Sequence, residues 1–212
     1  MTTAPKTKKH RHSQSQPSLY TLHVELIGIR PSIWRRIQID GRVRLHVLHE
    51  VLQAAMGWNG SHLHKFLIRN LHYGIPDPEL DEIGWVMHDE KKYRLNQLLD
   101  VNDTCDYLYD FGDSWFHRIT VESIEDIDTD SASANYALIT DGQRACPPEN
   151  CGSPGNYLQM LEVLEDAPYS DEAKALREWA GFDFDPERFD RQAAMVDLDE
   201  FRGLDPMELY RK

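Results

Sequence analysis

The sequence predicts an α+β protein: a mixed or antiparallel sheet with an N-terminal β-β-α unit, a central hairpin and C-terminal helices. Near the start of the chain, apolar residues alternate with polar ones. After residue 44 the apolar spacing changes to three and four, and the last third of the chain is helical in pattern. Because the 212 residues contain no internal repeat, we expect a single domain over residues 19–212, preceded by a disordered basic tail over residues 1–18.

The N-terminal unit begins with two expected strands. Apolar and polar side chains alternate over residues 20–26 and again over residues 33–39, after a break at Pro31. A period of two is typical of half-buried strands. Residues 45–56 then place their apolar side chains on one helical face, and Gly57 stands where a helix C-cap belongs. The first helix is therefore expected to follow the second strand directly.

The middle of the chain predicts a hairpin among shorter elements. Two strands, residues 104–111 and 115–122, flank a tight turn at Gly112. The other expected elements are a strand over 62–68, an irregular segment over 71–82, a strand near 84–88, a helix over 95–99, an acidic exposed loop over 123–135 and a strand over 136–140.

The C-terminal third predicts helices after a loop. Two prolines keep residues 146–152 out of both helix and strand. Three helices are expected beyond it: one whose apolar face includes residues 157–164, one capped by Ser170 and ending at Gly181, and one capped by Asp185 with Pro186 in its first turn.

The charge balance limits the classes of partner. The net charge is −13, from 36 acidic and 23 basic side chains, whereas proteins that bind nucleic acid through its phosphates are basic. We therefore do not expect the folded body to bind nucleic acid. No apolar run approaches the ~20 residues that span a bilayer, so we expect no membrane segment. An odd number of cysteines, three, without a secretory signal indicates a reducing compartment, and we expect a cytoplasmic protein.

Seven blocks carry a resemblance to a known family: Ile33-Trp34-Arg35-Arg36, Leu48-His49, Ala55-Met56-Gly57-Trp58, His62-Leu63-His64-Lys65-Phe66, residues 109–117, residues 144–149 and Phe184-Asp185-Pro186. Through these blocks the chain resembles the plasmid pRiA4b ORF-3-like family over about residues 19–204. The resemblance implies an α+β domain that is frequently encoded near plasmids or transposable elements, without an assigned biochemical activity. Some members carry a transposon-resolvase label, which the acidic composition and the lack of a recombinase motif do not support.

Four side chains are candidate zinc ligands. On a strand, His62 and His64 would share one face and could offer two nitrogen ligands to one ion. Cys146 and Cys151 could add two thiolates, and a closed four-ligand site of this kind would be structural. The alternatives are a hydrogen-bonded histidine pair and a rigid proline loop with two incidental thiols.

The turn at Gly112 carries the catalytic candidates. Asp110 or Asp113 could orient His117, as in a general-base pair or a support for a metal ligand. The alternative is that the aspartates hydrogen-bond the turn amides. The Asp-Phe-Gly triplet resembles the kinase motif, but the glycine-rich and catalytic loops of kinases are missing.

Tryptophans and arginines form the candidate ligand-binding set, because an aromatic and basic groove could receive an anionic or aromatic ligand. The alternative is a set of core tryptophans and salt-bridged arginines. No P-loop or dinucleotide fingerprint occurs, so no nucleotide cofactor is predicted. The residues concerned are Trp34, Arg35, Arg36, Trp58 and Trp115.

These observations favour an accessory binding protein without catalysis, associated with mobile elements and directed to an unknown protein partner. One alternative is a zinc-dependent hydrolase built on His62, His64, His117 and the aspartates near Gly112, with Cys146 and Cys151 either ligating the metal or bracing the loop. A further alternative is an acidic protein-binding inhibitor or DNA mimic, for which competition with a basic partner would weaken at high salt. Zinc is the one cofactor that the residues suggest.

Overall fold

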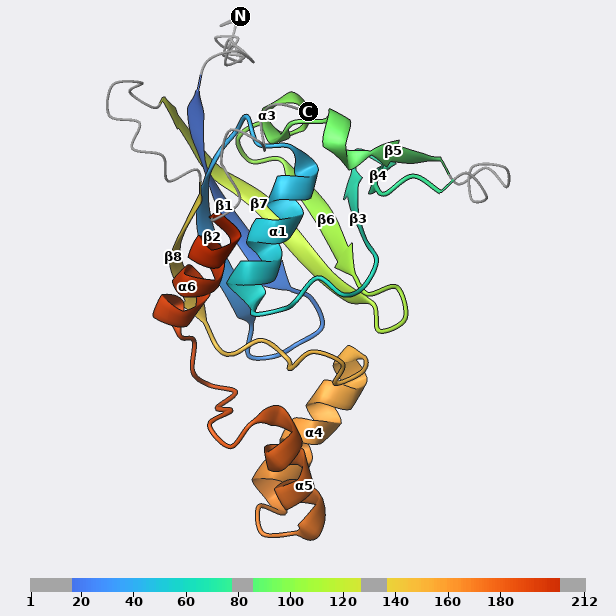
Figure 1. The fold of residues 1–212 in the computed structure, drawn as a ribbon, viewed down its shortest axis with the longest axis vertical. Coiled ribbons are helices and arrows are strands. Elements are labelled where there is room, and N and C mark those ends of the chain that lie inside the picture. Colours follow the sequence, from blue (N-terminus) through green and yellow to red (C-terminus); the bar gives the residue numbers. More distant parts are fainter. Residues whose placement is uncertain (1–16, 78–85, 127–136, 203–212) are drawn as a thin grey trace, which may run out of the picture.

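The protein has an α+β fold around one sheet of eight strands (Figure 1). A computed structural model describes residues 17–77, 86–126 and 137–202. Along the sheet the order is β5-β4-β3-β6-β7-β1-β2-β8, and neighbours are antiparallel except the parallel pair β4 and β5. The strands are β1 (Ser18–Leu26), β2 (Ile33–Asp40), β3 (His64–Ile68), β4 (Leu71–Gly74), β5 (Met87–Asp89), β6 (Thr104–Tyr109), β7 (Trp115–Asp126) and β8 (Ala137–Gln143).

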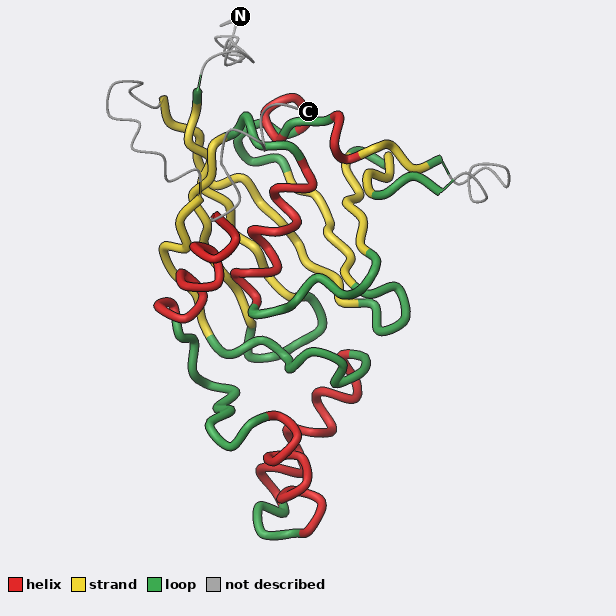
Figure 2. Tube along the Cα trace, viewed as in Figure 1, coloured by secondary structure: helices red, strands yellow, loops and turns green. Residues whose placement is uncertain are grey.

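The helices divide between one face of the sheet and one of its ends. They are α1 (Leu45–Met56), the 3-10 helix η1 (Glu90–Lys92), α3 (Leu95–Leu98), α4 (Pro154–Asp166), α5 (Asp171–Ala180) and α6 (Arg191–Arg202). α1 and α6 lie against each other on the same face of the sheet, whereas α4 and α5 form a hairpin that projects beyond the sheet (Figure 2). Within the described ranges, no helix has the length and apolar character that crossing a bilayer requires.

The core lies between the sheet and α1. Leu22, Val24 and Leu26 of the central strand β1 are fully buried, and Leu48 and Leu52 of α1 are buried against the same core. The alternation in the sequence therefore produces one buried sheet face, as a period of two requires. Since burying a leucine side chain is worth about 2 kcal/mol, this face supplies much of the stability of the fold.

The opposite face of the sheet carries the intervening polar side chains. Arg36 of β2 forms an ion pair with Glu122 of β7, with 2.7 Å between Nε and Oε2, and Arg118 pairs with Asp106. These cross-strand pairs explain why polar residues alternate with apolar ones along the central strands.

Several element boundaries differ from the sequence-based expectation. Leu71–Gly74 forms strand β4 inside the segment that was expected to be irregular, and β7 extends to Asp126, into the expected acidic loop. No helix begins at Pro186: Asp185 Oδ1 accepts a hydrogen bond from the Glu187 amide, which makes a turn. The next helix, α6, begins at Arg191 instead. Of the expected disordered tail, residues 1–16 lie outside the described residues.

Candidate functional site

Three loops meet at the end of the sheet that faces α4. They connect α1 to β3, β6 to β7 and β8 to α4 (Figure 1). The Trp58 indole donates a hydrogen bond to the Pro147 carbonyl over 2.9 Å, and its ring stacks on Tyr109, with centroids 5.0 Å apart. We call the side chains that gather here the loop-end cluster: Trp58, His62, Tyr109, Asp110, Asp113, Glu149 and Asn150.

His62 lies among three acceptor groups of this cluster. Its Nδ1 is 3.5 Å from Asp110 Oδ2, and its Nε2 is 2.9 Å from Asn150 Oδ1 and 3.6 Å from Glu149 Oε1. Glu149 is itself fixed, because it accepts a hydrogen bond of 3.0 Å from the Tyr109 hydroxyl. The imidazole, 31% exposed, thus has an oriented position at the surface.

The turn between β6 and β7 explains the position of Asp110. This residue has a left-handed backbone, φ 57°, which aspartate tolerates better than most side chains. Its Oδ1 accepts hydrogen bonds from the amides of Gly112 and Asp113, over 2.8 and 3.2 Å. Burial, followed by the charge of Asp110, raises the pKa of Asp113. The aspartates therefore build the turn, and Asp110 faces His62 rather than His117.

His117, a candidate partner of the turn aspartates, lies in the core. It is fully buried, and its Nδ1 lies 3.3 Å from the Tyr107 carbonyl. Burial lowers the pKa of His117 to about 4, so the ring is neutral near pH 7. A general base must reach its substrate, and this side chain has no exposed surface.

His64 belongs to a separate buried network on the helical side of the sheet. Its Nε2 lies 2.8 Å from Glu90 Oε2, and its ring stacks on His49, with centroids 3.4 Å apart. His49 Nδ1 is 2.8 Å from the Tyr107 hydroxyl, which also accepts a hydrogen bond of 2.8 Å from Gln53 Nε2. Burial, followed by the charge of His64, lowers the pKa of His49 to about 3.

This network was not predicted from the sequence. The sequence feature that could have indicated it is the position of His49 and Gln53, two polar side chains four residues apart within the apolar stretch of α1. Side chains at that spacing lie on one side of a helix and can share a partner.

The four expected zinc ligands lie in separate surroundings. His62 contacts the loop-end cluster and His64 contacts Glu90, whereas Cys146 Sγ lies 3.0 Å from Met56 Sδ. Burial raises the pKa of Cys146 to about 11 and that of Cys151 to about 12, which disfavours their thiolates. Within residues 17–77, 86–126 and 137–202, no three His, Cys, Asp or Glu side chains are arranged to hold a metal ion. This geometry gives no support to a four-ligand zinc site.

The structure divides the expected aromatic and basic groove. Arg35 is buried, and its Nε donates to the Ala55 carbonyl over 2.8 Å, so it neutralises the C-terminal end of α1. Trp34 and Arg36 lie on the opposite face of the sheet, where Trp34 stacks on His23. Trp58 and Trp115, with ring centroids 6.0 Å apart, lie by the loop-end cluster. The five residues therefore do not form one surface.

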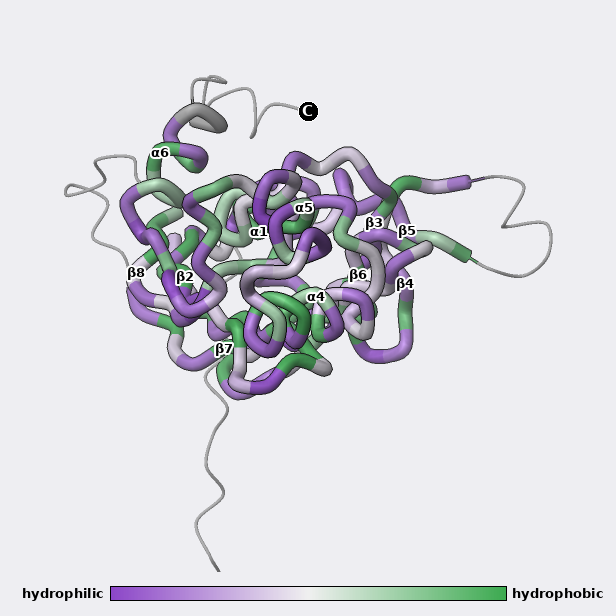
Figure 3. Tube along the Cα trace, turned by 90° about the horizontal axis from the view of Figure 1, so that it is seen from below, coloured by the Kyte–Doolittle hydropathy of each residue, from purple (hydrophilic) through white to green (hydrophobic). Residues whose placement is uncertain are grey.

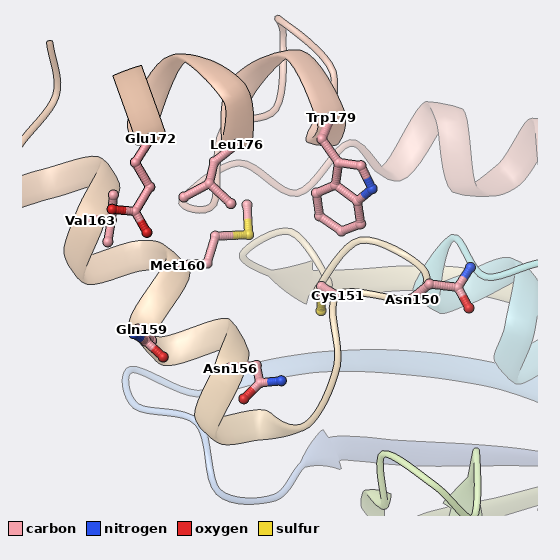
Figure 4. A pocket seen from close by; sticks show the side chains of 9 residues that line it. All are labelled: Asn150, Cys151, Asn156, Gln159, Met160, Val163, Glu172, Leu176 and Trp179. Carbon is pink, nitrogen blue, oxygen red and sulfur yellow. The ribbon is translucent and has the colours of Figure 1, made fainter. Parts of the chain in front are cut away.

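A cavity adjoins the loop-end cluster beneath the helical hairpin. It has a volume of about 340 Å³ and lies between the Cys151 loop, α4 and α5 (Figure 4). No pattern in the sequence indicated it, because it depends on how α4, α5 and the preceding loop pack against one another. The lining residues are Asn150, Cys151, Asn156, Gln159, Met160, Val163, Glu172, Leu176 and Trp179.

The hairpin around this cavity is acidic and carries exposed aromatic side chains. Residues 154–190 hold ten acidic and three basic side chains, a net charge of −7. Tyr169 is 89% exposed, Phe182 83% and Trp179 50%. Figure 3 views the molecule from this end, with α4 and α5 in front of the sheet. Exposed aromatic side chains of this size can contribute to an interaction site.

The family model for plasmid pRiA4b ORF-3-like proteins matches residues 18–193, which covers the sheet, α1 and the hairpin. The chain belongs to this family. It is 37% identical over 168 residues to the uncharacterized protein y4hQ of Sinorhizobium fredii, covering 77% of this chain and 81% of that protein. The crystal structure of MM3350 from Methanosarcina mazei Go1, a protein of unknown function, is similar with a TM-score of 0.75 and 33% identity, covering 85% of this chain and 98% of that one.

Four of the blocks through which the chain resembles the pRiA4b ORF-3-like family meet at the loop-end cluster. They contribute Trp58, His62, Tyr109 and Glu149, which the contacts above connect. The resemblance in sequence therefore includes this end of the sheet as well as the core.

Proposed function

We propose that the protein is an accessory binding protein that presents the acidic α4–α5 hairpin to a basic protein partner. The observation that carries this proposal is the combination of three exposed aromatic side chains, Tyr169, Trp179 and Phe182, with a net charge of −7 in the same segment. Tyrosine and tryptophan are enriched among the residues that dominate binding energy, and complementary charge accelerates association.

The other candidate residues support a binding role rather than catalysis. His117 is buried, the carboxylate of Asp110 holds turn amides, and the raised pKa of Cys151 disfavours its thiolate at neutral pH. The description of the family after a plasmid reading frame supports an association with mobile elements. The same proposal places the protein in the cytoplasm, where its free cysteines would stay reduced.

Site-specific photo-crosslinking in the native host tests this proposal. A photoreactive amino acid replaces Tyr169, between α4 and α5, or Phe182, just after α5, and a control carries it at Phe116 of β7, which is 44% exposed. We expect the two hairpin positions to crosslink the same basic protein and the control position not to. Crosslinking of that protein equally at all three positions, or of acidic proteins alone, would contradict the proposal.

The acidic charge also supports a second candidate, in which the hairpin imitates DNA and inhibits a nucleic-acid-binding partner. This candidate makes a separate prediction about the crosslinked partner. Duplex DNA should then compete with the hairpin for that partner, and both complexes should weaken as salt rises. Simultaneous binding of DNA and hairpin would reject mimicry and leave the accessory role intact.

A further inference from the structure

We infer that the cavity between the Cys151 loop, α4 and α5 receives an arginine side chain of the basic partner. This inference rests on the proposed function and names the group that the hairpin recognises. The cavity volume of about 340 Å³ is at the small end of the range of ligand sites, roughly 300–1,000 Å³. It therefore suits one long side chain rather than a large cofactor.

The middle of the cavity is apolar. Met160 and Val163 come from α4 and Leu176 from α5, and Met160 extends toward Leu176 (Figure 4). The aliphatic stem of an arginine buries well along a surface of this kind while its charged end stays in contact with polar groups. This strip of side chains therefore provides the contact for the stem.

Polar groups occupy the two ends of the cavity. Glu172 and Trp179 are seven residues apart on α5, which corresponds to about 10 Å along a helix axis. Glu172 points toward Val163 at one end, and Trp179 extends toward Cys151 at the other (Figure 4). On α4, Asn156 lies toward the Trp179 end and offers an amide side chain for the backbone of a bound peptide, whereas Gln159 lies toward the other end and Asn150 points away from the cavity (Figure 4).

The charge of the cavity selects a cation. Among the described residues, Glu172 is the one charged side chain that lines it, and no described lysine or arginine does so. The surrounding segment, residues 154–190 with a net charge of −7, disfavours an anionic ligand. A guanidinium can form two parallel hydrogen bonds to the Glu172 carboxylate, whereas an ammonium makes a point contact. The site therefore fits an arginine whose stem lies over Leu176 and whose head reaches Glu172.

Titration with short capped peptides tests the inference on the full-length protein. The probe is acetyl-Gly-Arg-Gly-amide, and the same peptide with norleucine or glutamate in place of arginine serves as comparison. The readout is the NMR signal of the Trp179 indole N–H, assigned with a Trp179→Phe variant. We expect a saturable shift with the arginine peptide and an affinity about threefold to fivefold above that of the norleucine peptide at low salt, as an exposed ion pair provides. The glutamate peptide should produce no shift.

Two matched variants of α5 test whether Glu172 is the residue that recognises the arginine. Glu172→Gln and Glu178→Gln each remove one exposed negative charge, but Glu172 alone lines the cavity. We expect Glu172→Gln to abolish the preference for arginine over norleucine and Glu178→Gln to preserve it. Equal binding of the two peptides to the unaltered protein, or equal losses in both variants, would overturn the inference. If the hairpin still crosslinks a basic protein in that case, the cavity assignment fails and the proposed function stands.

Discussion

The sheet body and the α4–α5 hairpin differ in how they use apolar side chains. In the body, β1 places Leu22, Val24 and Leu26 in the core with no exposed surface. The hairpin buries only Tyr157, Met160 and Ala173 of its two helices and leaves Trp179 half exposed. Apolar side chains in the body therefore stabilise the fold, whereas those of the hairpin are available to a partner.

Titratable groups show the same contrast. The body holds histidines that burial keeps neutral, His49 and His117, whereas the hairpin keeps its acidic side chains in contact with solvent. Acid should therefore act mainly on the stability of the body, and salt mainly on binding by the hairpin.

The largest expected loss of stability comes from truncating a buried leucine of the body, with an exposed leucine of the hairpin as the comparison. Leu22→Ala removes a fully buried side chain from β1 and should lower the free energy of unfolding by about 3 kcal/mol, because the core cannot collapse around the cavity. Leu158→Ala on α4, where the side chain is 40% exposed, should cost less than about 1 kcal/mol. Urea denaturation measures both, and equal losses would contradict the comparison.

The pH dependence of stability tests the contrast between the buried histidines of the body and the exposed acidic side chains of the hairpin. The folded-state pKa of His49, about 3, is below the value of 6.5 expected for the unfolded chain, so its contribution is complete above pH 6.5 and is lost as pH falls toward 3. Between pH 7 and pH 5 this should remove about 2 kcal/mol from the free energy of unfolding. A His49→Gln variant should lose less over the same interval in urea titrations. Parallel pH profiles for the two proteins would contradict the assignment.

Removal of the Tyr107 hydroxyl should lower the free energy of unfolding by a somewhat smaller amount. Tyr107→Phe leaves His49 Nδ1 and Gln53 Nε2 without the partner that each has at 2.8 Å. Because unpaired buried polar groups cost about 1–3 kcal/mol, we expect a loss of about 1.5 kcal/mol by thermal or urea unfolding. Tyr169→Phe is the matched control, because that residue is 89% exposed. A comparable loss in the control would refute the role of the network.

The smallest effect on stability should come from the exposed aromatic side chains. Tyr169→Ser with Phe182→Ser should change the free energy of unfolding by less than about 0.5 kcal/mol, because both side chains are more than 80% exposed. The affinity for the crosslinked partner should nevertheless fall about tenfold, since exposed aromatic residues often dominate binding. Unchanged affinity in a folded double variant would exclude these side chains from the interface.

Regular elements with strong periodicity were predictable from the sequence. The alternation over residues 20–26 and 33–39 predicted β1 and β2, and the spacing of three and four over residues 45–56 predicted α1. Gly57 caps α1 with φ 79°, as its position indicated. Strand β4 was missed because its four residues are too few to establish a period.

Two local sequence patterns did not predict the structure correctly, because tertiary contacts determined the conformation of those segments. The Asp185-Pro186 pair suggested a helix start, but the Pro186 carbonyl accepts a hydrogen bond from the Ala145 amide, and the segment forms a turn. His62 and His64 are two residues apart, yet only His64 lies in β3. The histidine that begins the strand points to the core and the other stays in the loop, so spacing alone did not place them together.

The sequence by itself determined the α+β class, the family and the acidic charge, because periodicity, ordered blocks and composition are properties of the chain alone. The tertiary structure decided which side chains meet. It brought His62 beside Asp110 and Glu149, stacked His49 on His64, and formed a cavity between the Cys151 loop and two helices. Such contacts join residues from different elements, and their geometry depends on how strands and helices pack, which no local pattern specifies.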